Sequence, residues 1–148
     1  MFDRYNFDRY NEEAKRALFF ARNAVSQHGG SQIEPEHMLI GLLAARPEAV
    51  LKLPSSTAIV DEMRQRMVAA IAGGTRLPES HEVRFSRESV DALERAQIEA
   101  ADMSNDTIRP EHLLLGILVE TDGEATAALR DAGVHVSVIR EALSSRGE

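Results

Sequence analysis

The feature that most constrains the fold of this chain is an internal repeat. The segment 33–43 returns as 108–118, an offset of 75 positions, and both copies carry a Pro-Glu-His triplet followed by an apolar run and a glycine. The correspondence continues back without a gap to Tyr10, which pairs with Phe85. A chain with such self-similarity folds as two copies of one unit whose apolar faces cover each other.

The repeat divides the 148 residues into two halves. We expect a first unit at 7–72, a linker at 73–84 and a second unit at 85–145, together making one double-repeat domain. The linker contains Gly73, Gly74 and Pro78, residues that disfavour a continuous helix. The first half and the second half are the parts of the chain before and after this linker.

Apolar residues follow helical spacing in both halves. On the first predicted helix they recur at steps of three and four, at Ala14, Ala17, Leu18, Ala21 and Val25. Asn11 and Ser86 stand where an N-cap is expected, and Gly29-Gly30 ends the first helix. Pro35 and Pro110 occupy positions suited to the first turn of a helix, where the missing N–H costs nothing.

The helices that begin at these two prolines are apolar nearly all round, so they should lie at the centre, with Leu39, Leu43, Leu114 and Leu118 in the core. A short third helix is expected at about 47–53 and at 123–132, and a fourth closes each half. The sequence therefore predicts an all-α fold. Its architecture is two pseudo-symmetric four-helix repeats forming one eight-helix domain.

Composition excludes several classes of protein. Apolar residues make up 43% and charged residues 28%, as in globular proteins with a packed core, and there is no cysteine to form a disulfide or a thiolate site. The net charge is −7, and no basic stripe marks a nucleic-acid surface. No apolar run is long enough to span a membrane, and no signal pattern opens the chain. These features predict a cytoplasmic protein without nucleic-acid or membrane partners.

The sequence shows no constellation of catalytic residues. His37 and His112 each follow a glutamate, but without the paired histidine spacing of a zinc site they are best interpreted as structural residues at helix starts. Neither a phosphate-binding Gly-x-x-x-x-Gly-Lys-Ser/Thr loop nor a Gly-x-Ser-x-Gly elbow is present. We therefore expect no enzyme activity, no cofactor, no metal and no bound ATP.

Phe19 and Phe20 break the repeat. Their counterparts in the second half are Glu94 and Arg95, which have the character of solvent-facing residues. Two copies of one fold should expose equivalent positions, so at least one phenylalanine is expected either at a partner-binding surface or at the seam between the halves.

These motifs resemble a known family. Two Glu-His motifs that open apolar helices, each preceded by an alanine-rich helix, look like the N-terminal domain of the Clp AAA+ unfoldases, and so does the Met-Phe-Asp-Arg-Tyr start. The resemblance covers 7–143. It implies an eight-helix domain that binds adaptor or substrate proteins and delivers them to an ATPase ring.

The alternative to protein recognition is a helical regulator that binds a small ligand. Some similar domains bind phosphoarginine at the glutamates of their two Glu-His motifs, which correspond here to Glu36 and Glu111. Pro35 and Pro110 replace a residue that offers the phosphate a hydroxyl and an N–H in those relatives. Because Glu34 adds negative charge beside the first motif where Arg109 stands beside the second, we expect any such binding around Arg109 and Glu111.

Overall fold

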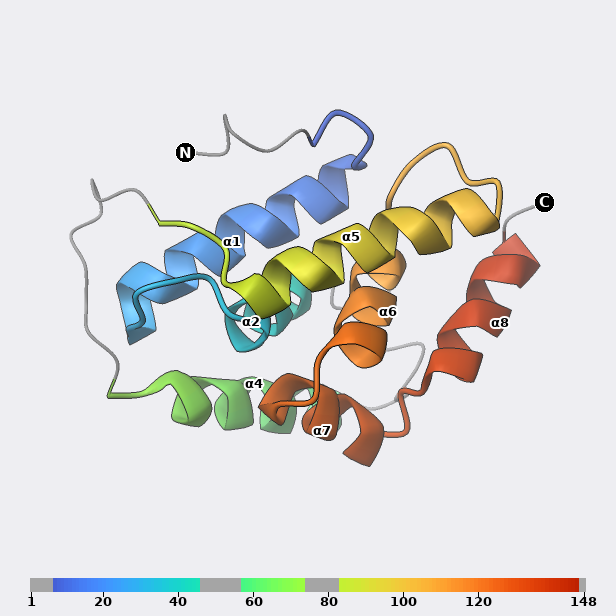
Figure 1. The fold of residues 1–148 in the computed structure, drawn as a ribbon. Helices are drawn as coiled ribbons and strands as arrows, with labels where there is room; N and C mark the ends of the chain where they lie inside the picture. The colour runs from blue at the N-terminus through green and yellow to red at the C-terminus, as the bar shows by residue number, and fades with distance from the viewer. Residues whose placement is uncertain (1–6, 46–56, 74–82, 147–148) are drawn as a thin grey trace.

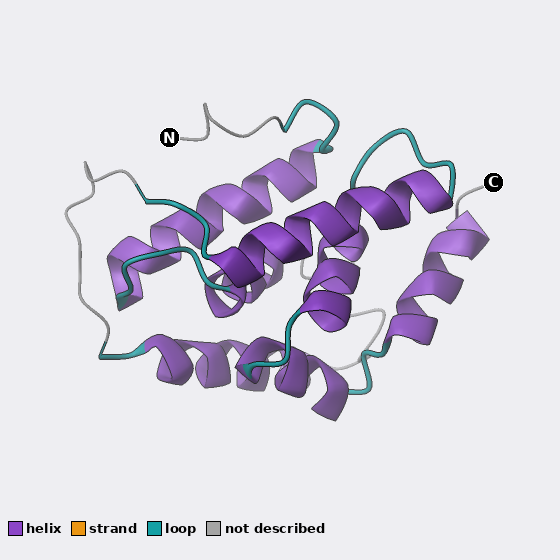
Figure 2. Ribbon diagram, in the orientation of Figure 1, coloured by secondary structure: helices purple, strands orange, loops and turns teal. Residues whose placement is uncertain are grey.

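The computed structural model describes residues 7–45, 57–73 and 83–146, and within them the fold is all-α (Figures 1 and 2). The prediction of an all-helical chain is confirmed. The third helix predicted at about 47–53 lies outside the described residues. The helices are α1 (Glu12–His28), α2 (Pro35–Ala45), α4 (Thr57–Ile71), α5 (Arg87–Asp102), α6 (Pro110–Glu120), α7 (Glu124–Asp131) and α8 (Val136–Arg146).

The predicted helix boundaries agree with the structure. The side chain of Asn11 accepts a hydrogen bond from Ala14 N at 2.8 Å, and that of Ser86 accepts one from Ser89 N at 3.2 Å. Gly29, with φ of 116°, ends α1 in a conformation that other residues rarely adopt. The short Val-His-Val alternation at 134–136 is not a strand; it leads into α8.

Helices α2 and α6 form the centre of the molecule. Each contacts the preceding long helix, α2 against α1 and α6 against α5, and the two also contact each other. The predicted core leucines are all buried: Leu39, Leu43, Leu114 and Leu118. Among the largest fully buried side chains of the described residues, most lie on these two helices, and burial of apolar side chains stabilises the fold.

A glycine in each central helix permits a very close helix crossing. A Cβ at Gly41 would lie 2.0 Å from the carbonyl oxygen of Ala17, and one at Gly116 would lie 2.0 Å from that of Ala92. No side chain fits at either position. The Pro-Glu-His…Gly motif is therefore, in part, a packing motif, and it sets the same crossing in both halves.

The two halves are joined by reciprocal backbone pairing. The segment before α1 pairs with the loop before α6 at Tyr10 and Ile108, and the segment before α5 pairs with the loop before α2 at Phe85 and Ile33. The hydrogen bonds Asn11 N to Ile108 O (2.9 Å) and Ile108 N to Arg9 O (2.8 Å) have counterparts at equivalent positions in the other pair. Each half thus completes the backbone hydrogen bonding of the other.

The shorter helices lie around this centre. In Figure 1, α4 and α7 run along one side and α8 lies at the far end from α1. Helix α4 contacts α2 in its own half and α7 in the other half, while α8 contacts α6. Of the helices in the described part of the chain, none is both long and apolar enough to cross a membrane.

Candidate partner-binding surfaces

The phenylalanine pair on α1 forms an exposed aromatic surface. The side chain of Phe19 is 54% exposed, Phe20 is half-buried, and their rings lie 5.9 Å apart in an edge-to-face arrangement. At the equivalent positions of α5, Glu94 is exposed and Arg95 is half-buried. Phe19 is therefore the residue left uncovered, and we call Phe19 with Phe20 the aromatic patch.

The two motif histidines are structural. His37 Nδ1 accepts a hydrogen bond from Glu34 N at 2.9 Å, and its Nε2 donates one to the Gly29 carbonyl at 2.8 Å. His112 Nδ1 accepts one from Arg109 N at 2.9 Å, and its Nε2 lies 3.2 Å from the Asn105 side-chain amide. Both rings thus satisfy backbone groups at the start of a central helix, which requires the neutral imidazole.

Burial keeps these imidazoles neutral. It lowers the pKa of His37 and lowers the pKa of His112 to about 4, against the opposing effect of the neighbouring Glu36 and Glu111 carboxylates. A ring that is uncharged at neutral pH, with Nδ1 already accepting a backbone N–H, is not placed to act as a base. The described residues also contain no group of three or more His, Asp or Glu side chains that could hold a metal.

The first Glu-His motif borders an acidic cavity of about 350 Å³ that both halves line. Glu34, Glu36, Glu88 and Asp122 supply four carboxylates to its wall. Burial, together with repulsion from Glu88 and Glu36, raises the pKa of Glu34 against a hydrogen bond from Ser86. A phosphate would meet electrostatic repulsion here, whereas a cationic group would be attracted.

The Glu36 carboxylate also has a partner in the second half of the chain. Its Oε2 accepts a hydrogen bond from Ala125 N, in the first turn of α7, at 3.1 Å. This contact links α2 to α7 and was not predicted, because it depends on how helices 89 residues apart in sequence meet in space.

The second Glu-His motif has a different environment. Glu111 is buried at 2% exposure within α6, and Arg109 is half-buried just before that helix. The two residues lie close in sequence at the start of α6. Arg109 supplies a positive charge where the first motif has Glu34.

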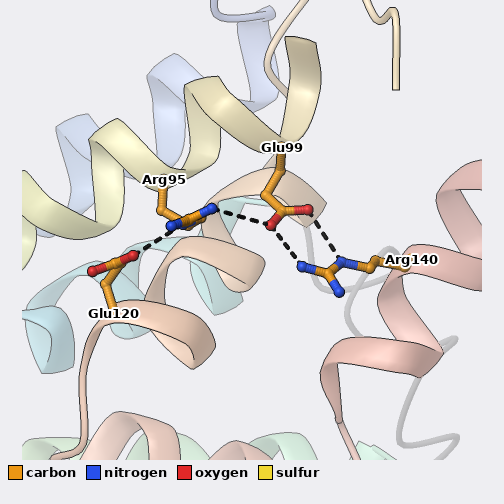
Figure 3. Close-up of polar contacts among 4 residues, drawn as sticks. All are labelled: Arg95, Glu99, Glu120 and Arg140. Carbon is orange, nitrogen blue, oxygen red and sulfur yellow. Dashed lines mark hydrogen bonds and ion pairs between the residues drawn. The ribbon is translucent and has the colours of Figure 1, made fainter. Parts of the chain in front are cut away.

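A chain of charged side chains joins α5, α6 and α8 (Figure 3). Glu99, whose side chain is only 5% exposed, accepts two hydrogen bonds from Arg140, at 3.2 and 2.8 Å. Arg95 lies 3.9 Å from Glu99 and donates to Glu120 at 2.9 Å. The sequence indicated that Arg95 faces solvent, but it is a half-buried member of this network; only its four-residue spacing from Glu99 hinted at the pairing.

The fold and its motifs define an all-α domain built on a duplicated helix pair. The profile of the Clp repeat N-terminal domain matches residues 9–144, so the chain belongs to that family. The resemblance found in the sequence is confirmed.

Individual relatives agree with this assignment. The chain is 26% identical over 136 residues to the negative regulator of genetic competence ClpC/MecB of Bacillus subtilis, covering 91% of this chain and 16% of the relative. It is 28% identical over 135 residues to the chloroplastic chaperone protein ClpC of Pisum sativum, covering 90% and 14%. The chain thus spans about a sixth of the length of these relatives.

A solved structure shows the same fold. The N-terminal domain of the chaperone ClpD from Arabidopsis thaliana superposes with a TM-score of 0.75 at 24% identity, covering 97% of this chain and 100% of that one.

Proposed function

We propose that this domain recognises other proteins, namely adaptors or substrates of a cytoplasmic Clp unfoldase, through the aromatic patch on α1. The observation that carries the proposal is the 54% exposure of Phe19 at a position where the equivalent helix has a charged residue. Aromatic side chains supply large apolar contact area at low entropic cost and are enriched at the centres of protein interfaces.

Capture experiments with matched variants test this function. The immobilised domain is incubated with lysate of the source cells, and bound proteins are identified by mass spectrometry. We expect Clp adaptors or substrates among them, and expect Phe19→Ala to lose them. Ile98→Ala is the control, because Ile98 is a comparably exposed apolar residue (46%) on the other long helix, α5. Equal loss in both variants, or retention in both, would contradict the role of the patch.

Thermal melts separate binding from folding. Because Phe19 is exposed, its truncation should leave the melting temperature close to that of the wild type. A large drop in melting temperature would show that Phe19 packs against the domain itself.

The second candidate is a regulator that binds a small ligand such as phosphoarginine around Arg109 and Glu111. The observation that favours the second motif is the carboxylate lining of the cavity at the first one. Arg109 is half-buried and can pair with a phosphate, whereas Glu111, at 2% exposure, can pair with a guanidinium only if the ligand displaces the groups that cover it. In calorimetric titration with free phosphoarginine, we expect heat that disappears in Glu111→Ala and survives in Glu36→Ala. No heat at millimolar ligand would eliminate this candidate.

A further inference from the structure

Helix α7 begins without a cap of its own. Its N-cap position is Gly123, which has no side chain to accept a hydrogen bond from the first turn. The helix is only eight residues long, Glu124–Asp131, too short to be stable in water by itself. Its persistence must therefore depend on groups from elsewhere in the molecule.

Glu36 supplies an acceptor that the local sequence lacks. Its Oε2 accepts from Ala125 N at 3.1 Å, in the first turn of α7. A carboxylate at this place is also favoured by the positive end of the helix dipole. Gly123 leaves room for it, since a Cβ there would lie 3.0 Å from the same oxygen.

A second set of contacts also joins α7 to the first half of the chain. Arg66 of α4 donates to Glu124 and to Asp131, the first and last residues of α7, each at 2.8 Å. These pairs are exposed, so solvent and salt weaken them. The partly buried contact with Glu36 is consequently the better placed of the two to fix the start of α7.

We propose that Glu36 is the N-terminal cap of α7, supplied in trans from the other half of the chain, and that it positions α7 against α2 and α4. Glu36 is then a positioning residue. A cationic group that enters the acidic cavity and takes Oε2 of Glu36 competes with Ala125 N for that atom, whereas one that binds Oε1 leaves the cap in place.

Hydrogen exchange on the full chain tests the cap without any ligand. In Glu36→Ala we expect the amides of the first turn of α7 to exchange about fivefold faster, the size of a lost helix cap. Glu88→Ala is the matched control, because it removes a carboxylate from the same cavity wall while Glu88 lies on α5. Equal exchange of α7 in the two variants would overturn the proposal.

A rescue experiment distinguishes capping from general packing. Position 123 has φ of −102° and ψ of −156°, extended backbone that a serine adopts readily. In the Glu36→Ala background, Gly123→Ser supplies a local cap and should restore slow exchange in α7. In the wild-type background Glu36 already supplies an acceptor, so the same substitution adds a second one and should leave the exchange of α7 nearly unchanged.

Slower exchange caused by Gly123→Ser in the Glu36→Ala background, with little change in the wild type, is the expected result. Failure of Gly123→Ser to slow exchange in the Glu36→Ala background would overturn the proposal. If Glu36→Ala folds poorly, Glu36→Gln replaces it, because glutamine keeps an acceptor oxygen and should retain most of the protection of α7. Loss of that protection in an otherwise folded Glu36→Gln variant would also overturn the proposal.

Discussion

The first and second halves share one helix pair but carry different chemistry at equivalent positions beside its core. On α5 and α6, Arg95, Glu99 and Glu120 belong to a charged network that also holds α8. The equivalent residues on α1 and α2 are Phe20, Ala24 and Ala45, beside the exposed Phe19.

This difference separates what the scaffold requires from what a function can use. The glycine crossings, the histidines and the core leucines are the same in both halves, so they belong to the fold. Positions beside this shared core differ: the second half has internal ion pairs at Arg95, Glu99 and Glu120, whereas the first half leaves Phe19 exposed.

The strongest test of the shared scaffold is the glycine pair. Gly41→Ala and Gly116→Ala each place a Cβ 2.0 Å from a backbone oxygen of the neighbouring helix. Backbone cannot move away without separating the helices, so each variant should lose more than about 4 kcal/mol of unfolding free energy. Urea denaturation measures it. A large loss of unfolding free energy in only one of the two variants would show that the two crossings are not equivalent.

Equivalent core leucines should lose similar amounts of unfolding free energy when truncated, and less than the glycine variants lose. Leu39→Ala and Leu114→Ala each remove a fully buried side chain at equivalent positions, with an expected cost of about 2–5 kcal/mol in chemical denaturation. A cost below about 1 kcal/mol for either variant would mean that its central helix is peripheral to stability.

Low pH tests a feature that both halves share, the buried histidines His37 and His112. Their folded-state pKa values are lowered, so the unfolded chain binds more protons as the pH falls. The stability they contribute is complete above the unfolded pKa of about 6.5 and is lost as the pH falls towards 4, by about 3 kcal/mol for His112.

Melting temperatures between pH 7.5 and 4 measure this loss. In His112→Gln the melting temperature should fall less between pH 7.5 and 4 than in the wild type. The control His135→Gln, at an exposed position, should follow the wild type. An unchanged slope in His112→Gln would show that other groups govern the acid response.

The charged network should give the smallest effect, and within the described residues it belongs to the second half alone. Glu99→Gln weakens charge-assisted hydrogen bonds to a half-exposed Arg140, with an expected cost of about 1–2 kcal/mol. The cost should fall in 1 M salt, where charges are screened over about 3 Å. Thermal denaturation at two salt concentrations checks it. A cost independent of salt would indicate lost packing rather than a lost ion pair.

Local signals in the sequence were sufficient for the described helices and for the core leucines. Asn11, Ser86 and the two prolines act within a few residues of their own helix, so their roles can be inferred from short-range spacing. The charged counterparts of Phe19 and Phe20 in the repeat marked this pair as unusual, but the sequence did not show which of the two is exposed or exclude a place at the seam between the halves.

Contacts between distant helices could not be predicted in this way. Glu36 reaches Ala125, Arg66 reaches Asp131 and Arg140 reaches Glu99 only because of how the helices pack. Each of these charged residues has the sequence character of an ordinary surface residue. Spacing along one helix carries no information about which helix lies opposite.

The reciprocal backbone pairing at Tyr10 with Ile108 and at Ile33 with Phe85 has a consequence for the assembly of such a unit. A polypeptide holding a single copy would offer an unpaired lead-in segment and an unpaired loop, and neither could reach its complement on the same copy. Two identical polypeptides would satisfy both at once as a twofold symmetric homodimer. Covalent fusion of the copies turns that association, which depends on concentration, into an intramolecular event.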